Sequence, residues 1–88
     1  MESRPRPAVE TETERQQLIR DELLAILAKH YERDWTEFIT LSQQFLDSAL
    51  AREVVAQLRN AGYIEEEVRG TIRLTARGYM GGYMAFHK

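Results

Sequence analysis

The spacing of apolar residues changes once along this chain of 88 residues, and the change falls at Gly62. Before Gly62, apolar residues recur about every three or four positions, which indicates amphipathic α-helices. Residues 64–68 and 71–74 instead follow a two-residue period, which indicates β-strands. Arg69 and Gly70 lie between these two runs, and glycine suits a tight hairpin turn. The sequence therefore predicts an α+β fold that is mostly α, with helices first and a β-hairpin after them.

The first predicted helix covers residues 14–33. Its apolar residues are spaced as on one face of an amphipathic helix. This stripe consists of Ile19, Leu23, Leu24, Ile26, Leu27, His30 and Tyr31. His30 lies on the stripe, and the other histidine, His87, is far away in the sequence. We therefore interpret His30 as a packed side chain rather than a metal ligand.

The second predicted helix is short and has two alternative starting points. Asp34 and Glu37 have the spacing of a capping box, so the helix is expected to begin at Asp34, with Thr40 as the competing cap. It is expected to end near Leu46. Its apolar face consists of Phe38, Leu41 and Phe45.

The third predicted helix begins after Asp47 or Ser48, either of which can cap it, and ends near Ala61. Gly62 follows where a left-handed residue commonly ends a helix. The inward face is expected to consist of Leu50, Ala51, Val54, Val55 and Leu58. Ile64, Ile72 and Leu74 of the hairpin are expected to pack against it, since so short a chain offers them no other partner.

Several classes of protein are excluded by composition. The chain has no cysteine, which excludes a disulfide framework, a cysteine zinc site and a thiol nucleophile. It has no catalytic grouping of Ser, His and Asp and no glycine-rich phosphate loop, so we expect no enzyme, cofactor or metal site. It has no apolar run long enough to cross a membrane and no apolar signal segment, so we expect a cytoplasmic protein without membrane contact.

The order of the predicted elements resembles that of the winged helix–turn–helix family. The most specific part runs from Leu58 to Gly78: it reads L-R-N-A-G-Y-I, then a hairpin, then R-L-T-A-R-G. This is similar to the ending of many bacterial and archaeal winged-helix regulators, and the resemblance covers roughly residues 16–78. It implies a three-helix winged-helix domain over residues 14–78, with the hairpin as the wing.

The family resemblance also implies a function. Its third helix enters the major groove of double-stranded DNA, and its wing touches the neighbouring backbone. A small transcriptional regulator acting as a dimer is therefore the first expectation. The candidate DNA contacts that this carries over are Ser48, Ala49, Arg52 and Arg59 on the third helix, and Arg69 and Arg73 on the hairpin.

The distribution of charge favours a second interpretation. The net charge is −2, and cations and anions balance between Asp47 and Arg77. The hairpin carries three consecutive glutamates at 65–67, and Glu53 lies on the expected DNA-facing side of the third helix. Acidic groups oppose the phosphate contacts that supply most non-specific affinity. The alternative is therefore a protein–protein interaction module, such as an adaptor or assembly subunit, that does not bind DNA.

The two ends of the chain are predicted to lie outside the domain. Residues 1–13 contain few apolar residues, so we expect a flexible N-terminal tail. Residues 79–88 form a C-terminal tail rich in aromatic residues and methionine, after a candidate cap at Thr75. Two alternatives stay open for this tail: packing onto the domain, or an interface with a second copy or another protein. The candidate interface residues are Tyr79, Met80, Tyr83, Met84 and Phe86.

Overall fold

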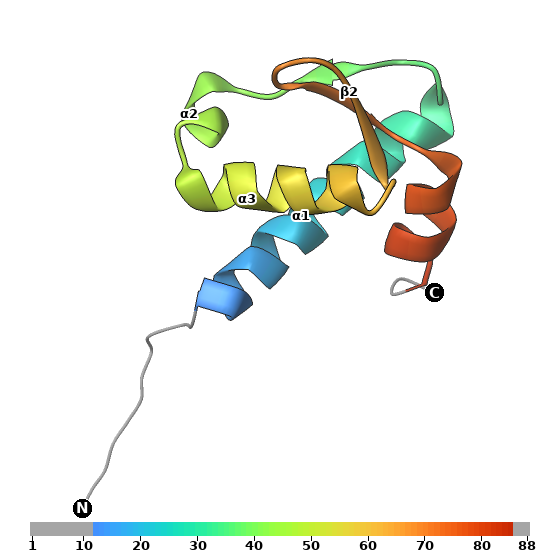
Figure 1. The fold of residues 1–88 in the computed structure, drawn as a ribbon. Coiled ribbons are helices and arrows are strands. Elements are labelled where there is room, and N and C mark those ends of the chain that lie inside the picture. The colour runs from blue at the N-terminus through green and yellow to red at the C-terminus, as the bar shows by residue number, and fades with distance from the viewer. Residues whose placement is uncertain (1–11, 86–88) are drawn as a thin grey trace, which may run out of the picture.

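The computed structural model of the chain describes residues 12–85 (Figure 1). Its elements, in chain order, are α1 (Glu12–Arg33), β1 (Ile39–Thr40), α2 (Gln43–Leu46), α3 (Ala49–Asn60), β2 (Ile64–Val68), β3 (Thr71–Leu74) and the π-helix η1 (Gly78–Tyr83). The α+β, mostly helical class predicted from the sequence is confirmed. No helix within residues 12–85 combines the length and the apolar character needed to cross a membrane.

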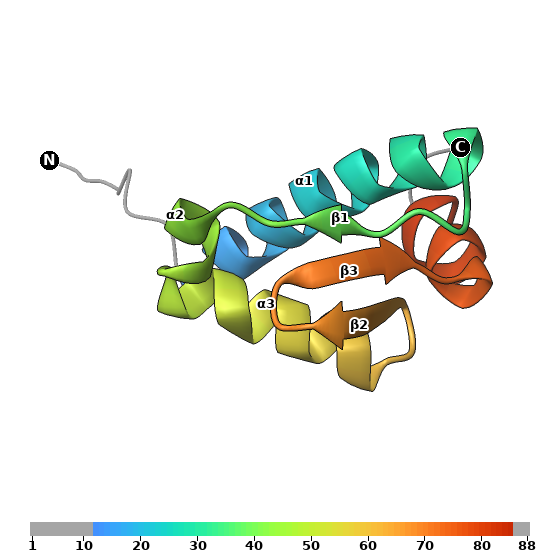
Figure 2. The same ribbon diagram turned by 90° about the horizontal axis from the view of Figure 1, so that it is seen from above.

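The strands of residues 12–85 form one antiparallel, three-stranded sheet in the order β1-β3-β2 (Figure 2). The central strand β3 carries Ile72, which pairs with Ile39 of β1 on one side and with Glu66 of β2 on the other. An irregularity between Glu66 and Val68 shifts the register near the hairpin turn. The long helices α1 and α3 pack against the same side of this sheet (Figure 1).

One hydrophobic core joins α1, α3 and the sheet. Its buried members are Leu23, Leu24, Leu27 and Ala28 of α1, Val54, Val55 and Leu58 of α3, and Ile64, Ile72 and Leu74 of the sheet. Four of the five residues predicted for the inward face of the third helix are buried, namely Ala51, Val54, Val55 and Leu58, so the predicted phase is confirmed. The fifth, Leu50, is only half-buried. The predicted inward face of the hairpin is confirmed as well, because Ile64, Ile72 and Leu74 are buried.

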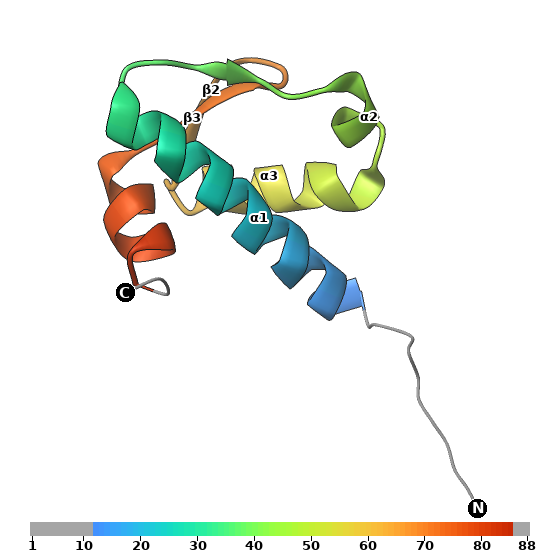
Figure 3. The ribbon, with the colours of Figure 1, turned by 180° about the vertical axis from the view of Figure 1, so that it is seen from behind.

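The buried face of α1 is rotated from the predicted one. Ile26 is 47% exposed, whereas Ala28 is buried, so the prediction that Ile26 belongs to the core is wrong. The cause is η1, which packs along the C-terminal half of α1 (Figure 3). There Tyr79 stacks on Tyr31, with ring centroids 4.8 Å apart. The side of α1 covered by η1 thus includes Leu24, which lies beside Gly82, whereas Ile26 lines an open groove next to β1.

Asp34 does not cap a helix, contrary to the prediction. Its Oδ1 accepts hydrogen bonds from the backbone N–H of Thr36 at 3.1 Å and from the Thr36 hydroxyl at 2.6 Å. Aspartate often forms such a local turn with the residue two positions on. The turn uses the carboxylate, and the chain continues in an extended conformation instead of a helix.

The extended segment becomes β1, a strand that the sequence analysis missed. Thr40 lies in this strand and is not a cap, so the competing prediction is wrong as well. The helix α2 begins later, at Gln43, where the Ser42 hydroxyl oxygen accepts a hydrogen bond from Phe45 N at 3.1 Å. Its end at Leu46 agrees with the prediction.

Two glycines adopt the left-handed backbone conformation that their predicted roles require. Gly62 has φ +79° and ends α3, while Gly70 has φ +84° in the hairpin turn. Beyond α3, Tyr63 N donates to Leu58 O at 2.9 Å and Gly62 N donates to Arg59 O at 3.0 Å. These two hydrogen bonds form a Schellman motif, which satisfies carbonyls at the helix end.

The segment after β3 folds back onto the domain. The Thr75 hydroxyl accepts from Gly78 N at 3.0 Å and donates to Gly62 O at 2.7 Å, which anchors the start of the segment. Of the candidate interface residues, Tyr79 and Tyr83 pack against the core, whereas Met80 (65%) and Met84 (38%) are exposed. Residues 12 and 13, which were predicted to belong to the flexible N-terminal tail, are instead the first residues of α1. The rest of that predicted tail, up to residue 11, and Phe86 lie outside the described residues.

The close approach of η1 to the chain before β2 allows a test by substitution. A Cβ atom at Gly78 would lie 2.1 Å from the Tyr63 carbonyl oxygen, whereas one at Gly81 would meet nothing nearer than 3.8 Å. Gly78→Ala is therefore expected to lower the free energy of unfolding by about 1–3 kcal/mol or more. The control Gly81→Ala is expected to leave it unchanged or raise it by up to about 1 kcal/mol. Urea denaturation measures both, and equal effects of the two substitutions would contradict this packing.

Candidate functional site

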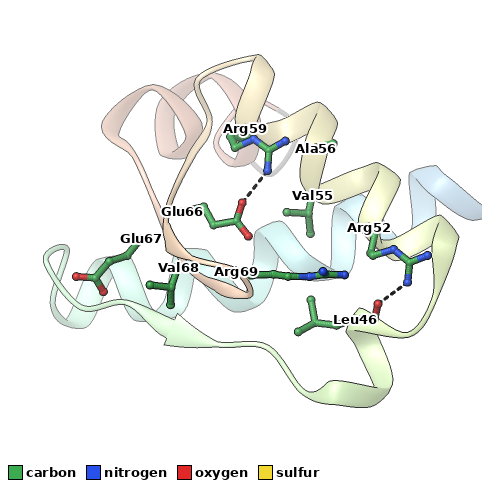
Figure 4. A pocket seen from close by; sticks show the side chains of 9 residues that line it. All are labelled: Leu46, Arg52, Val55, Ala56, Arg59, Glu66, Glu67, Val68 and Arg69. Atoms are coloured by element: carbon green, nitrogen blue, oxygen red, sulfur yellow. Dashed lines mark hydrogen bonds and ion pairs between the residues drawn. The ribbon is translucent and has the colours of Figure 1, made fainter.

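An open groove of about 450 Å³ lies between α3 and the β2–β3 hairpin (Figure 4). One wall is α3 and the other is the hairpin from Glu66 to Arg69. Leu46 of α2 lies at the hairpin-turn end of the groove and packs against Gly70. Three of the predicted DNA contacts, Arg52, Arg59 and Arg69, line this groove together.

The two arginines of α3 reach the groove because of the phase of the helix. They are about two helical turns apart and thus lie on one face, next to the buried Val55. Arg52 Nη1 donates a hydrogen bond to the carbonyl oxygen of Leu46 at 2.6 Å. Arg59 Nη1 donates to the Glu66 carboxylate of β2 at 2.6 Å. Each arginine therefore ties α3 to a neighbouring element.

Glu66 is the central acidic group of the groove. The side chain faces α3 because it lies opposite the buried Ile72 in the β2–β3 register, and cross-strand partners point to the same face of a sheet. The second carboxylate oxygen accepts a hydrogen bond from Gly70 N in the hairpin turn at 2.9 Å. The Glu66 side chain is 16% exposed, so the carboxylate is held between α3 and the turn.

The surroundings of Glu66 favour its ionised form. The hydrogen bond from Gly70 N makes the largest contribution to lowering the pKa of Glu66, and partial burial opposes it. The hydrogen bond from Arg59 and the positive charges of Arg59 and Arg69 lower this pKa further. At neutral pH the groove therefore contains a fixed negative charge between its arginines.

Arg69 is the arginine of the groove with the most freedom to bind another molecule. Its side chain extends from the hairpin turn toward α3 and Arg52 (Figure 4). It makes no direct hydrogen bond or ion pair with another residue of the described range 12–85, although its charge acts on Glu66. Its five N–H donors are therefore available to an acceptor outside the domain.

The structure does not bring Arg73 into the groove. This side chain lies on the other face of the sheet, where Nε donates to Glu65 at 2.8 Å and Nη1 to the carbonyl oxygen of Thr36 at 2.9 Å. The guanidinium also lies 4.5 Å from the centre of the Phe38 ring. Arg73 thus joins the hairpin to the loop that precedes β1.

Ser48 and Ala49 also lie outside the groove, at the start of α3. The Ser48 hydroxyl oxygen accepts a hydrogen bond from Ala51 N at 3.1 Å, so its observed role is that of the N-cap. This agrees with one of the two predicted caps. Ala49 is exposed in the first turn of α3.

Glu66 was not predicted as a part of the site, because the glutamates at 65–67 were interpreted only as acidic groups that oppose DNA binding. A usable signal was present in the two-residue period of the strand. Ile64 was predicted to face inward, and Glu66 falls on the same side of the strand as Ile64. The same two-residue period places Glu65, which pairs with Arg73, on the opposite face of the strand from Glu66.

The groove combines arginine side chains with the carboxylates of Glu66 and Glu67. Within the part of the chain that the structure describes, no group of three or more His, Asp or Glu side chains is placed to hold a metal ion. The sequence matches no protein-family model, and comparisons with curated proteins and with solved structures give no significant match. The arginines and Glu66 are therefore the basis for assigning a function.

Because the pKa of Glu66 is lowered in the folded protein, part of the folding stability is expected to be lost in acid. Glutamate ordinarily titrates near pH 4.3. A carboxylate with a lower pKa in the folded state adds stability above that pH, and the contribution is lost as the pH falls through the folded-state value. Glu66→Gln removes this contribution, so the variant is expected to lose less stability than the wild type between about pH 5 and pH 3.

Thermal unfolding at a series of pH values measures this difference. Glu67→Gln is the matched control, because Glu67 lines the same groove without a direct hydrogen bond or ion pair to another residue of 12–85. This control is expected to lose as much stability as the wild type on acidification. If Glu66→Gln loses just as much, the Glu66 carboxylate does not carry the effect.

Proposed function

We propose that this chain adopts the winged helix–turn–helix fold and binds double-stranded DNA through α3 and the turn of the β2–β3 hairpin. The order of elements supports the fold: two residues, Asp47 and Ser48, separate α2 from α3, and the hairpin follows α3 directly. The motif that resembles winged-helix regulators lies in this same region. In such domains the helix after the turn enters the major groove.

The observation that carries the proposal is the convergence of Arg52, Arg59 and Arg69 on one open groove. They come from two elements that the proposed fold would place against DNA. Arginine binds phosphate oxygens and guanine edges in a planar, bidentate manner, which makes it the side chain best suited to this role. Enzymatic chemistry has no comparable support among the described residues.

The proposed roles differ between the three arginines. Arg52 is in the first turns of α3, so it is positioned to reach a base edge. Arg69 is at the hairpin turn, where we assign it to a phosphate of the flanking backbone. Arg59 shares its charge with Glu66. The net positive charge offered to phosphates therefore comes mainly from Arg52 and Arg69.

The alternative function is a protein–protein interaction module. One observation favours it: Val68, at the edge of the same groove, is 62% exposed. Glu66 and Glu67 also reduce the positive charge of this surface. A partner protein with an apolar side chain flanked by acidic residues would suit the groove in that case.

A titration with random-sequence 20-base-pair duplex at low salt tests the proposal. Arg52 and Arg69 have no acidic partner among the described residues, so they predict a slope of log affinity against log salt of about −2, since each cation that neutralises DNA charge contributes about −0.9. Arg69→Ala is expected to reduce the size of this slope by about one and to weaken binding to all sequences alike. Arg52→Ala is expected to weaken binding and also to relax base preference. Fluorescence anisotropy of a labelled duplex provides these values.

Lys29→Ala is the matched control for these variants. Lys29 is an exposed cation on α1, away from the groove, so its removal subtracts the same charge without touching the proposed interface. The control is expected to bind as the wild type does. Absence of wild-type binding at about 100 μM protein, the weak limit of non-specific DNA binding, would contradict the DNA proposal and favour the protein–protein alternative.

A further inference from the structure

Glu66 bridges the two walls of the groove. One carboxylate oxygen accepts from Arg59 on α3 (Figure 4). The other accepts from Gly70 N in the hairpin turn. Both oxygens are thus used by donors. A glutamine at this position has one acceptor oxygen, so its NH₂ group would face one of the two donors. The site therefore requires a carboxylate and not merely a polar side chain.

The bridge has two effects on Arg59. It balances the positive charge of the guanidinium, and it holds one of its nitrogens at a fixed place in the groove. The Arg59 side chain is still 48% exposed. An arginine has five N–H donors, so those not used by Glu66 remain available, with their direction restrained by the ion pair.

These two effects act differently on the two kinds of DNA contact. Attraction to phosphates depends on net positive charge, and a neutral Arg–Glu pair adds little to it. Recognition of a base depends on donors held in a defined direction, as when arginine binds O6 and N7 of guanine. A carboxylate paired with an arginine thus weakens the contribution of that arginine to non-specific binding. It preserves the contribution of the same arginine to base recognition.

We propose that Glu66 is a positioning residue that determines specificity in the proposed DNA interface, by directing Arg59 to a guanine edge and withholding its charge from the phosphates. This inference depends on the proposed function and adds two features to it. Arg59 becomes a base-reading residue, and a glutamate that opposes DNA binding electrostatically becomes a part of the recognition surface.

The test compares two probes: a pool of random 20-base-pair duplexes, and the duplex that the wild-type protein enriches from that pool. The measured quantity is the ratio of the two affinities. Glu66→Gln frees the charge of Arg59, so binding to the random pool is expected to tighten and its salt slope to steepen by about one. The affinity ratio is expected to fall about tenfold, the size of one lost base contact.

Two further variants separate the effect of charge from that of direction. Glu67→Gln removes the same charge from the same groove and leaves Arg59 bound to Glu66, so the affinity ratio is expected to stay at the wild-type value. Arg59→Lys keeps the charge but lacks the bidentate geometry, so the ratio is expected to fall while binding to the random pool is retained. This variant also provides the test if Glu66→Gln does not fold.

Each contrary result has a distinct meaning. If the wild type binds DNA and prefers one duplex, but Glu66→Gln and Arg59→Lys keep its ratio, the inference is overturned and the proposed function stands. A wild type that binds all duplexes equally overturns the inference as well. If the wild type binds neither probe, the proposed function itself is wrong, and the role of Glu66 in DNA recognition is rejected with it.

Discussion

The burial of Ile72 at the centre of β3 determines how the rest of the domain is arranged. This side chain is fully buried in the core formed with α1 and α3, and its neighbours across the strands are Ile39 and Glu66. Partners in an antiparallel sheet share a face, so the side chain that turns inward on β3 also turns Glu66 toward α3. A shift of the register by one residue would send Glu66 to the opposite face and remove the acid from the groove. Core packing and the chemistry of the groove therefore depend on the same pairing.

The four arginines of α3 and the hairpin divide into two groups according to the face of the sheet that they reach. On the α3 side, Arg52, Arg59 and Arg69 line a groove open to solvent. On the opposite side, Arg73 is occupied by Glu65, by a backbone carbonyl and by the Phe38 ring. This division explains how a chain of net charge −2 presents a cluster of cations on one surface. Net charge describes the whole molecule, whereas recognition depends on which charges remain unpaired in one place.

Local signals in the sequence were sufficient for much of the fold. The phase of α3, its end at Gly62 and the hairpin with Gly70 at its turn all follow from short-range patterns, and the structure agrees with them.

The predictions that failed concern contacts between distant parts of the chain. β1 exists because Ile39 pairs with Ile72, and no local pattern near Asp34 signals this pairing. Likewise, η1 packs on α1 through the stacking of Tyr79 on Tyr31, residues far apart in the sequence. In the candidate site, the helix phase indicated Arg52 and Arg59, but the bridge from Arg59 to Glu66 required the strand register.

The order β1-β3-β2 also has a consequence for the behaviour of the protein in concentrated solution. It places the most apolar strand in the middle and leaves β1 and β2 as the edges of the sheet described here. An exposed strand edge is a template on which another chain can add a strand and begin an aggregate. The β1 edge is two residues long, and the β2 edge carries charged side chains and a break in register near Glu67. Short length, charge and irregularity are the features by which natural sheets resist such growth. The glutamates of the hairpin are therefore expected to hinder the addition of a further strand at the β2 edge.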